Sequence, residues 1–296
     1  MLLSPNAAPV AALLLWAFGT ASLGLLAWTF GRGVRPPGAV LRRDANLIAT
    51  RPGAQVKYWL VAHLDTKAQG HSMAARLIAV WWVVASLALM LGLAVLRLWS
   101  GTKPIDPTLV VAMVAVAVIA GTLAGRGRLK GTTTGARDNG TGLLALLSAI
   151  EQTRDPALGV IVTGAEEFGV VGARHLVEAE PALVAGAAVI NLDTLCDSGS
   201  VYVITHRGSG SALATRVRKI LQPLGVSIVQ RRLPLGIVTD GVSLARVAGA
   251  VVDVSRLDWS VLRLIHTPQD SLDRLDPTFA ESLGRSLGQA LTGPPG

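Results

Sequence analysis

The chain has 296 residues, of which 51% are hydrophobic and only 16% are charged, and its formal net charge is +8. This composition is unusual for a soluble protein and points to membrane segments. The positive charge does not indicate nucleic-acid binding, because no basic stripe is interleaved with aromatic residues. The single cysteine, Cys196, excludes an intrachain disulfide bond.

Three apolar segments lie in the first half of the chain. Residues 10–30 and 77–96 are long enough to cross a bilayer and contain no charged side chain, and the shorter segment 109–124 contains none either. We therefore expect about three transmembrane helices, the first an N-terminal anchor over residues 1–31 and the others a hairpin over 74–125. The alternative is that the last two segments are buried core helices.

Basic residues are distributed unevenly around these segments. Five arginines follow the first segment and four basic residues follow the third, whereas the intervening loop offers only Arg97 and Lys103. The positive-inside rule then predicts a multi-pass protein of the cell membrane whose remaining C-terminal part lies on the cytoplasmic side. The lipid bilayer, through its anionic headgroups, is the expected partner of the excess charge.

The remaining sequence alternates between strand-like and helix-like segments. Residues 32–55 are rich in Gly, Pro and Arg and are expected to be a linker, while residues 56–296 form a domain that the hairpin interrupts. Strands are expected at residues 57–62, 159–163, 187–192, 201–205, 227–230 and 251–254, and helices at 143–153, 174–180, 211–221 and 277–291. This alternation predicts an α/β fold with a mostly parallel central sheet flanked by helices.

Acidic and histidine side chains follow several of these apolar runs, where α/β enzymes place their chemistry. The motifs are His63-Leu64-Asp65, Asp138-Asn139, Glu166-Glu167, Asp193 and His266. Imidazole and carboxylate groups are ligands of zinc-type ions, and two such ions side by side need a shared carboxylate. Of the two adjacent glutamates, one can bind metal while the other acts as a general base. The pattern predicts a site for two divalent metal ions.

The hairpin falls between His63 and Asp138 in the sequence. These residues can share one site only if the number of membrane crossings between them is even, and two crossings meet this condition. On an extended segment, His63 and Asp65 point to the same side. We therefore expect the Asp65 carboxylate to accept a hydrogen bond from the ring nitrogen of His63 that does not bind metal. The other histidines, His71, His175 and His206, are not expected to be ligands.

Five strings in this order resemble metallopeptidase family twenty-eight, the co-catalytic zinc aminopeptidase family that also contains glutamate carboxypeptidases and glutaminyl cyclases. They are Ala62-His63-Leu64-Asp65-Thr66, Gly135-Ala136-Arg137-Asp138-Asn139-Gly140-Thr141-Gly142, Glu166-Glu167-Phe168-Gly169, Asn191-Leu192-Asp193 and His266-Thr267-Pro268-Gln269-Asp270. A sister family of zinc carboxypeptidases shares two of the signatures but inserts a dimerisation lid, for which residues 194–265 leave no room. The resemblance covers residues 56–291 apart from the hairpin.

The resemblance implies a zinc exopeptidase fold and a ligand role for five residues. His63 and Asp193 would hold one zinc ion, Glu167 and His266 would hold the other, and Asp138 would bridge both. The peptide bond after Asp138 would be cis. Other divalent metals could take the place of zinc at such ligands.

The resemblance also implies catalytic and substrate-pocket residues. Glu166 would be the general base, and Asp65 would stand behind the ligand histidine. The string Thr239-Asp240-Gly241 lies where the family has Ser-Asp-His near the substrate pocket, so Gly241 replaces a histidine. Ile265 stands where an aromatic residue usually precedes the last ligand. These departures, at Asp240, Gly241 and Ile265, concern the choice of substrate rather than metal binding.

Together these features predict a membrane-anchored di-zinc exopeptidase, in the first place an aminopeptidase that hydrolyses short peptides with metal-activated water. One alternative is a catalytically inactive membrane receptor or scaffold on the same fold, which the complete set of ligands disfavours. The other is a zinc amidohydrolase or a glutaminyl cyclase-like enzyme, which only a substrate screen separates from an aminopeptidase.

Overall fold

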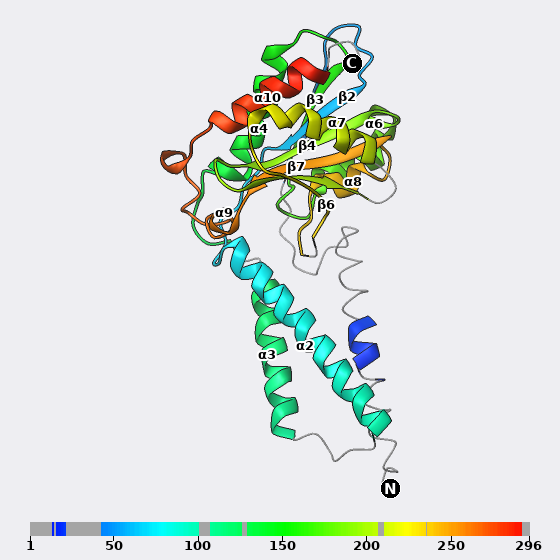
Figure 1. Cartoon of the computed structure of the whole chain (residues 1–296), viewed down its shortest axis with the longest axis vertical. Coiled ribbons are helices and arrows are strands. Elements are labelled where there is room, and N and C mark those ends of the chain that lie inside the picture. The colour runs from blue at the N-terminus through cyan, green and yellow to red at the C-terminus, as the bar shows by residue number, and fades with distance from the viewer. Residues whose placement is uncertain are drawn as a thin grey trace. The chain divides into compact units, whose positions relative to one another are not determined.

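The computed structural model describes residues 14, 16–21, 43–100, 107–125, 129–206, 210–234 and 236–291. The chain divides into two compact units, the first Met1–Leu41 with Ala74–Gly127 and the second Arg42–Met73 with Arg128–Gly296 (Figure 1). The second unit contains all the sequence motifs and is built from chain segments on both sides of the inserted hairpin.

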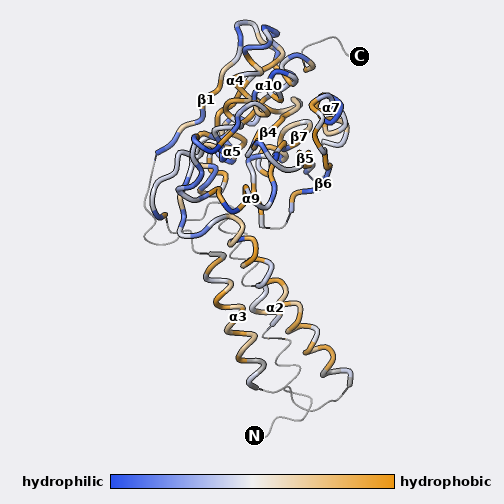
Figure 2. The backbone as a smooth tube through the Cα atoms, turned by 60° about the vertical axis from the view of Figure 1, so that its left-hand side comes forward, coloured by the Kyte–Doolittle hydropathy of each residue, from blue (hydrophilic) through white to orange (hydrophobic). Residues whose placement is uncertain are grey.

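The hairpin consists of two long helices, α2 (Met73–Ser100) and α3 (Pro107–Gly125). Hydrophobic residues follow one another along most of both helices (Figure 2). Large apolar side chains are exposed on both, including Trp82 at 58% and Val111 at 67%. A helix that exposes apolar side chains in this way suits lipid better than water. The indole N–H of Trp16, in the helical residues 16–21, donates to the carbonyl of Leu87 at 3.0 Å.

The expectation of about three transmembrane helices is wrong for the described residues. Only one helix in the described part of the chain, Met73–Leu96, is long and apolar enough to cross a membrane. The apolar stretch Val111–Leu123 within α3 is shorter. It measures about 20 Å, against about 30 Å for a hydrocarbon core. The predicted first segment, residues 10–30, lies outside the described residues except for 14 and 16–21.

The second unit is built on a seven-stranded sheet in the order β1-β3-β2-β4-β7-β5-β6. The strands are β1 (Leu47–Ala49), β2 (Tyr58–His63), β3 (Leu158–Thr163), β4 (Ala188–Leu195), β5 (Ser200–Thr205), β6 (Ile228–Arg232) and β7 (Ala250–Leu257). β3, β2, β4 and β7 run parallel, as do β5 and β6, whereas β1 with β3 and β5 with β7 are antiparallel. The sheet is therefore mixed, with a parallel centre.

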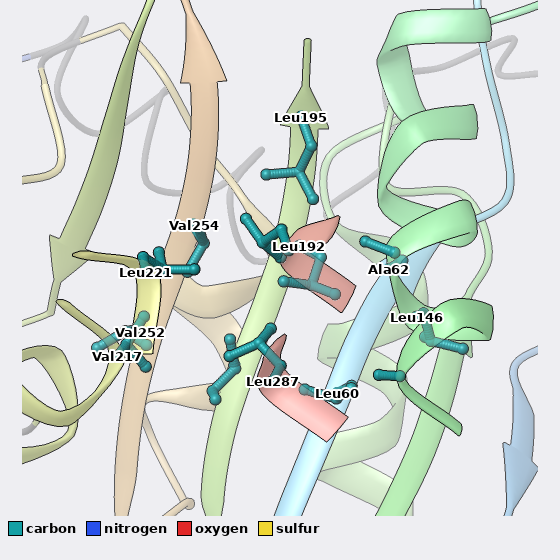
Figure 3. Packing of buried hydrophobic residues seen from close by; sticks show 14 of the residues in the cluster. Leu60, Ala62, Leu146, Leu192, Leu195, Val217, Leu221, Val252, Val254 and Leu287 are labelled. Atoms are coloured by element: carbon teal, nitrogen blue, oxygen red, sulfur yellow. The ribbon is translucent and has the colours of Figure 1, made fainter. Parts of the chain in front are cut away.

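Helices cover both faces of this sheet. The helices are α4 (Thr141–Gln152), α5 (Val171–Ala179), α6 (Pro181–Val184), α7 (Ser211–Leu221), α8 (Asp240–Leu244), α9 (Trp259–Leu262) and α10 (Thr278–Leu291). On one face, Leu60 and Leu192 of the sheet share a core with Leu146 of α4 and Leu287 of α10 (Figure 3). On the other face, neighbouring residues such as Trp59 pack against α5, α6 and α8. The central strands are buried on both faces, which explains their continuous apolar sequences.

Part of the segment expected to be a linker belongs to the sheet instead. Leu47–Ala49 form β1 and pair with β3 in antiparallel register. The preceding Asn46 side chain donates to the carbonyl of Gly172 at 3.0 Å and accepts from the N–H of Gly164 at 3.1 Å. All three residues of β1, the short apolar string Leu-Ile-Ala, are exposed, so the strand contributes no buried residue to the core. The ordered domain consequently begins before residue 56.

The parallel centre of the sheet brings the sequence motifs to one edge. His63 is the last residue of β2, and Glu166-Glu167 follow shortly after β3. Asp193 lies in β4 where the pairing with β7 shifts register between Leu192 and Leu195. Such irregularities redirect side chains and are common next to functional sites. This edge of the sheet is the candidate site.

Candidate metal centre

Five side chains from different parts of the chain converge into two ligand groups at this edge. The first group is His63, Asp138 and Asp193, and the second is Asp138, Glu167 and His266. Within each group the ligand atoms all lie within 4.8 Å of one another. The structure thus brings the residues together in the same two groups that the resemblance implied, with Asp138 common to both.

Asp138 lies between the two histidines. Its Oδ1 is 3.2 Å from Nε2 of His63, and its Oδ2 is 3.2 Å from Nε2 of His266. In the first group, Nε2 of His63 is also 3.8 Å from Oδ1 of Asp193. In the second, Nε2 of His266 is 3.1 Å from Oε2 of Glu167. Each oxygen of Asp138 faces a different imidazole, which is the arrangement that a carboxylate shared by two ions requires.

A short turn, η1 (Ala136–Gly140), presents Asp138, and its peptide bond to Asn139 is cis, as the resemblance implied. The Asn139 side chain fastens this turn to β4. Its Oδ1 accepts from the N–H groups of Gly142 and Thr194 at 3.0 and 3.1 Å, and its Nδ2 donates to the carbonyl of Leu192 at 2.9 Å. The turn that presents the Asp138 carboxylate is therefore held by contacts distant in the sequence.

Asp270 holds the same turn from the other side, and the sequence motifs gave it no role of its own. Its buried carboxylate accepts from the backbone N–H of Arg137 at 2.8 Å and of Asp138 at 3.2 Å. The guanidinium of Arg137 lies 3.7 Å from the same carboxylate. The only sequence signal was the place of Asp270 in the string that begins at His266.

Asp65 supports the site in a different way from the one we expected. The ring Nδ1–H of His63 donates to the backbone carbonyl of Asp65 at 3.0 Å, whereas the carboxylate Oδ1 lies 3.8 Å away. The carboxylate instead accepts from the backbone N–H groups of Glu166 and Glu167, at 2.9 and 3.0 Å. Asp65 thus fixes the tautomer of His63 through its carbonyl, and its carboxylate positions both glutamates.

The electrostatics of the two groups favour a bound cation. Burial alone would lower the pKa of His63, but hydrogen bonds with Asp138 and Asp193 hold it well above its usual value. Burial would also lower the pKa of His266, but hydrogen bonds with Asp138 and Glu167 raise this pKa to about 9. The clusters therefore attract positive charge, and binding of a metal ion would release protons. Oε1 of Glu167 is buried and has no hydrogen-bond partner among the described residues. An unpartnered carboxylate oxygen next to imidazole nitrogens is a set of ligand atoms that suits zinc.

Glu166 lies among these charges and is buried. Burial raises its pKa well above the usual value for a glutamate, His63 opposes this effect, and the charges of Asp240 and Asp193 reinforce it. A carboxyl group in such surroundings can exchange a proton closer to neutral pH than a surface glutamate, which suits a general base.

The three residues expected in the substrate pocket have different environments. Asp240, at the start of α8, is fully buried and accepts a hydrogen bond from the hydroxyl of Thr163. A Cβ atom on Gly241 would lie 2.0 Å from Oδ1 of Asp253 and 2.6 Å from Nε2 of His206, so no side chain fits there. Ile265 is buried. The imidazole of His206 therefore lies close to Gly241.

Asp240 should make the stability of the metal-free protein depend on pH. Burial raises its pKa to about 7, so the folded state retains a proton that the unfolded state releases near pH 4. Stability is then lost as pH rises from about 4 to 7. We expect Asp240→Asn to raise the free energy of unfolding at pH 8 by on the order of 2–4 kcal/mol, and to change it little below pH 4.

Chemical unfolding in detergent at several pH values measures this effect. Asp273→Asn is the matched control, because its side chain is 72% exposed. If Asp240→Asn and Asp273→Asn gave parallel stability profiles between pH 4 and 8, Asp240 would be ionised in the folded protein and the interpretation would be wrong.

A parallel-centred α/β sheet with two candidate ligand groups that share one aspartate is an arrangement typical of metal-dependent hydrolases. The sequence model of Peptidase family M28 matches residues 117–291, more than half of the chain. The chain belongs to this family. Among the curated protein sequences compared, none matches the chain.

Solved structures share the fold. The LapA aminopeptidase of Legionella pneumophila is 15% identical, with a TM-score of 0.53 over 85% of this chain and 54% of that chain. A zinc aminopeptidase from Bacillus subtilis is 15% identical, with a TM-score of 0.50 over 83% of this chain and 48% of that chain. A glutaminyl cyclase of Bacteroides thetaiotaomicron is 15% identical, with a TM-score of 0.55 over 84% of this chain and 77% of that chain.

This chain therefore spans about half the length of the two aminopeptidases. At such identities the likeness concerns the fold, an α/β sheet flanked by helices. The reaction and its substrate have to be argued from the site.

Proposed function

We propose that the protein is a di-zinc exopeptidase, specifically an aminopeptidase that acts on short peptides. The observation that carries this proposal is the position of Asp138, whose two oxygens each lie 3.2 Å from a histidine of a different ligand group. Family membership, which rests on residues 117–291, supports a peptidase reaction.

In this proposal His63 and Asp193 would hold one ion, Glu167 and His266 would hold the other, and Asp138 would contribute to both. The chemistry that bound zinc supplies is activation of water and polarisation of the scissile carbonyl.

Glu166 takes the proton from the attacking water and transfers it to the leaving amine. The backbone N–H groups of Glu166 and Glu167 donate to the Asp65 carboxylate at 2.9 and 3.0 Å. These bonds fix the position of the base relative to the adjacent ligand.

A metal analysis and a substrate screen of the detergent-purified chain test this function. We expect close to two zinc ions per chain, and hydrolysis of aminoacyl and short peptide substrates that a chelator stops and zinc restores. A chain without bound metal or activity would indicate a scaffold. Cyclisation of N-terminal glutaminyl peptides without peptide hydrolysis would indicate a cyclase instead.

We also propose that α2 anchors the protein in the cell membrane. Residues that precede and follow the hairpin in the sequence meet in one site, since Nε2 of His63 is 3.2 Å from Oδ1 of Asp138. If α2 crosses the membrane, the chain must therefore cross back before Asp138. The described helix available for the return is α3, whose 19 residues span about 28 Å in all, of which the apolar stretch Val111–Leu123 accounts for about 20 Å.

In this proposal the catalytic unit lies on the cytoplasmic side, an orientation based on the arginines that follow the hairpin in the sequence. Labelling of a cysteine introduced at Lys103 and a reporter fused to the C-terminus test this topology. We expect Lys103→Cys to be labelled from outside and the C-terminal reporter to be cytoplasmic. Both sites on the same side would contradict a spanning hairpin, and a C-terminus outside would reverse the orientation.

A further inference from the structure

The segment that leads into the hairpin contacts the second ligand group. Nζ of Lys67 is 2.8 Å from Oε2 of Glu167. The backbone N–H of Gln69 donates to the carbonyl of His266 at 2.8 Å. The chain therefore leaves the catalytic unit toward α2 directly from the metal centre.

The segment that follows the hairpin returns to the same place. Leu129 forms an antiparallel β-bridge with Gln69. The backbone N–H of Lys130 donates to the carbonyl of Ala68 at 2.9 Å. The two roots of the hairpin are thus joined to each other and, through Gln69, to the loop that carries His266.

The length of the chain limits the distance from this loop to the bilayer. The helix that is long and apolar enough to cross a membrane begins at Met73, four residues after Gln69. Four residues extend by at most about 14 Å. If α2 crosses the membrane, as proposed above, the loop of His266 lies close to the membrane surface.

The segments around the ligand groups expose large apolar side chains. Within the described part of the second unit, eight such side chains are at least 50% exposed, and two of these, Leu47 and Leu147, lie in β1 and α4. The other six, which we call the apolar rim, lie in segments that lead to or from residues of the site: Leu64, Leu129, Phe168, Val238, Trp259 and Leu272. Exposed apolar side chains gathered around one site usually mark an interaction surface.

The composition of the rim suits a lipid surface. Tryptophan is enriched at the boundary between membrane and water, and Trp259 belongs to the rim. Exposed cations accompany the rim at two places, because Lys130 follows Leu129 and Arg263 comes four residues after Trp259. Apolar side chains with neighbouring lysine or arginine are typical of surfaces that lie in the headgroup layer of a bilayer.

We propose that the apolar rim docks on the surface of the lipid bilayer and that the enzyme acts on peptides held in that surface. This rests on the proposed aminopeptidase function and on the proposed anchoring by α2. The substrate class is a short peptide whose apolar tail lies in the bilayer and whose free N-terminus reaches the metal centre. Confinement of enzyme and peptide to one surface raises the effective concentration of the substrate.

Fluorescence quenching by brominated lipids tests the docking without measuring activity. The full chain is placed in vesicles of phosphatidylcholine and phosphatidylglycerol, with a fluorophore on Leu129→Cys, on Leu272→Cys or on the matched control Leu47→Cys. Cys196 is fully buried and should not react in the folded protein. We expect the lipids to quench the labels at 129 and 272 at least about twofold more than the label at 47. Equal quenching at the three positions would overturn the docking.

Two peptides with the same N-terminal residues test the substrate class. One carries a C-terminal acyl chain that holds it in the vesicles, and the other is soluble. We expect the full chain in vesicles to hydrolyse the acylated peptide at least about tenfold faster at equal total, subsaturating concentration. A site that faces the solution predicts the opposite order, because the bilayer would withhold the acylated peptide. A soluble peptide that is hydrolysed as fast as the acylated one would overturn the substrate class.

Leu272→Asp separates docking from catalysis. A charge on the rim should lower kcat/KM for the acylated peptide several-fold and leave that for the soluble peptide unchanged, whereas Leu47→Asp should change neither. An equal loss on both peptides would give Leu272 a structural role and overturn its place in the rim. A chain that hydrolyses neither peptide would overturn the proposed function, and the quenching experiment would still decide the docking.

Discussion

Replacing Asp138 with alanine is expected to reduce bound zinc from about two ions per chain to below one and to abolish hydrolysis. Among the described residues, Asp138 is the one that both ligand groups share. Burial would raise its pKa, but hydrogen bonds with His266 and His63 keep the pKa low, so it is ionised. Metal polarisation of the substrate is worth several kcal/mol, and the rate should therefore fall by at least about three orders of magnitude.

Metal analysis of the purified variant, together with peptide hydrolysis, measures this loss. Asp273→Ala is the matched control, because its carboxylate is 72% exposed and it should retain both zinc and activity. The backbone N–H groups of Arg137 and Asp138 remain bonded to Asp270, so the turn should survive the truncation. Two tightly bound ions in Asp138→Ala would show that the groups do not share a ligand.

The parallel centre of the sheet was predictable because its strands are buried on both faces. Val61, Ile161, Ile190 and Val252 belong to unbroken apolar runs, and each is fully excluded from solvent. Such runs have a strong sequence signal. The convergence of the candidate ligands was predictable for a related reason: His63 and Asp193 stand at or near the ends of two of these runs.

The supporting contacts of the site left no such signal. Asp270 reaches Asp138 across 132 residues, and Lys67 reaches Glu167 across 100. Contacts at that separation depend on the assembled fold, not on local pattern. The role of Asp65 was misjudged because alternation along a strand places its carboxylate beside His63. The chain leaves the strand after His63, and the carbonyl of Asp65 approaches the ring instead.

The edge of the sheet shows a second limit of sequence patterns. β1 consists of three exposed residues that pair with β3, and the neighbouring Asn46 side chain bonds to Gly164 and Gly172, which are distant in the sequence. A segment with many Gly, Pro and Arg residues nearby is typical of a linker. The lengths of the apolar segments likewise overestimated the number of membrane-spanning helices in the described part of the chain. Composition alone does not show where a helix begins and ends.

Glu166→Gln is expected to lower kcat by about 10²–10⁴-fold while leaving both zinc ions in place. Glutamine keeps the volume of the side chain but cannot accept a proton from the attacking water. The ligand next to it, Glu167, is positioned through its own backbone N–H, which donates to Asp65 at 3.0 Å. The substitution therefore separates proton transfer from metal binding. A substitution of the adjacent Glu167 would not, because Glu167 belongs to the second ligand group.

Steady-state kinetics and zinc content of the same preparation test this separation. Glu178→Gln is the matched control, because Glu178 is an exposed glutamate of α5, and it should behave as the wild type. A Glu166→Gln variant with full activity would remove Glu166 from the mechanism. A variant that loses zinc along with activity would make Glu166 a ligand, and the division of labour between the two glutamates would have to be reversed.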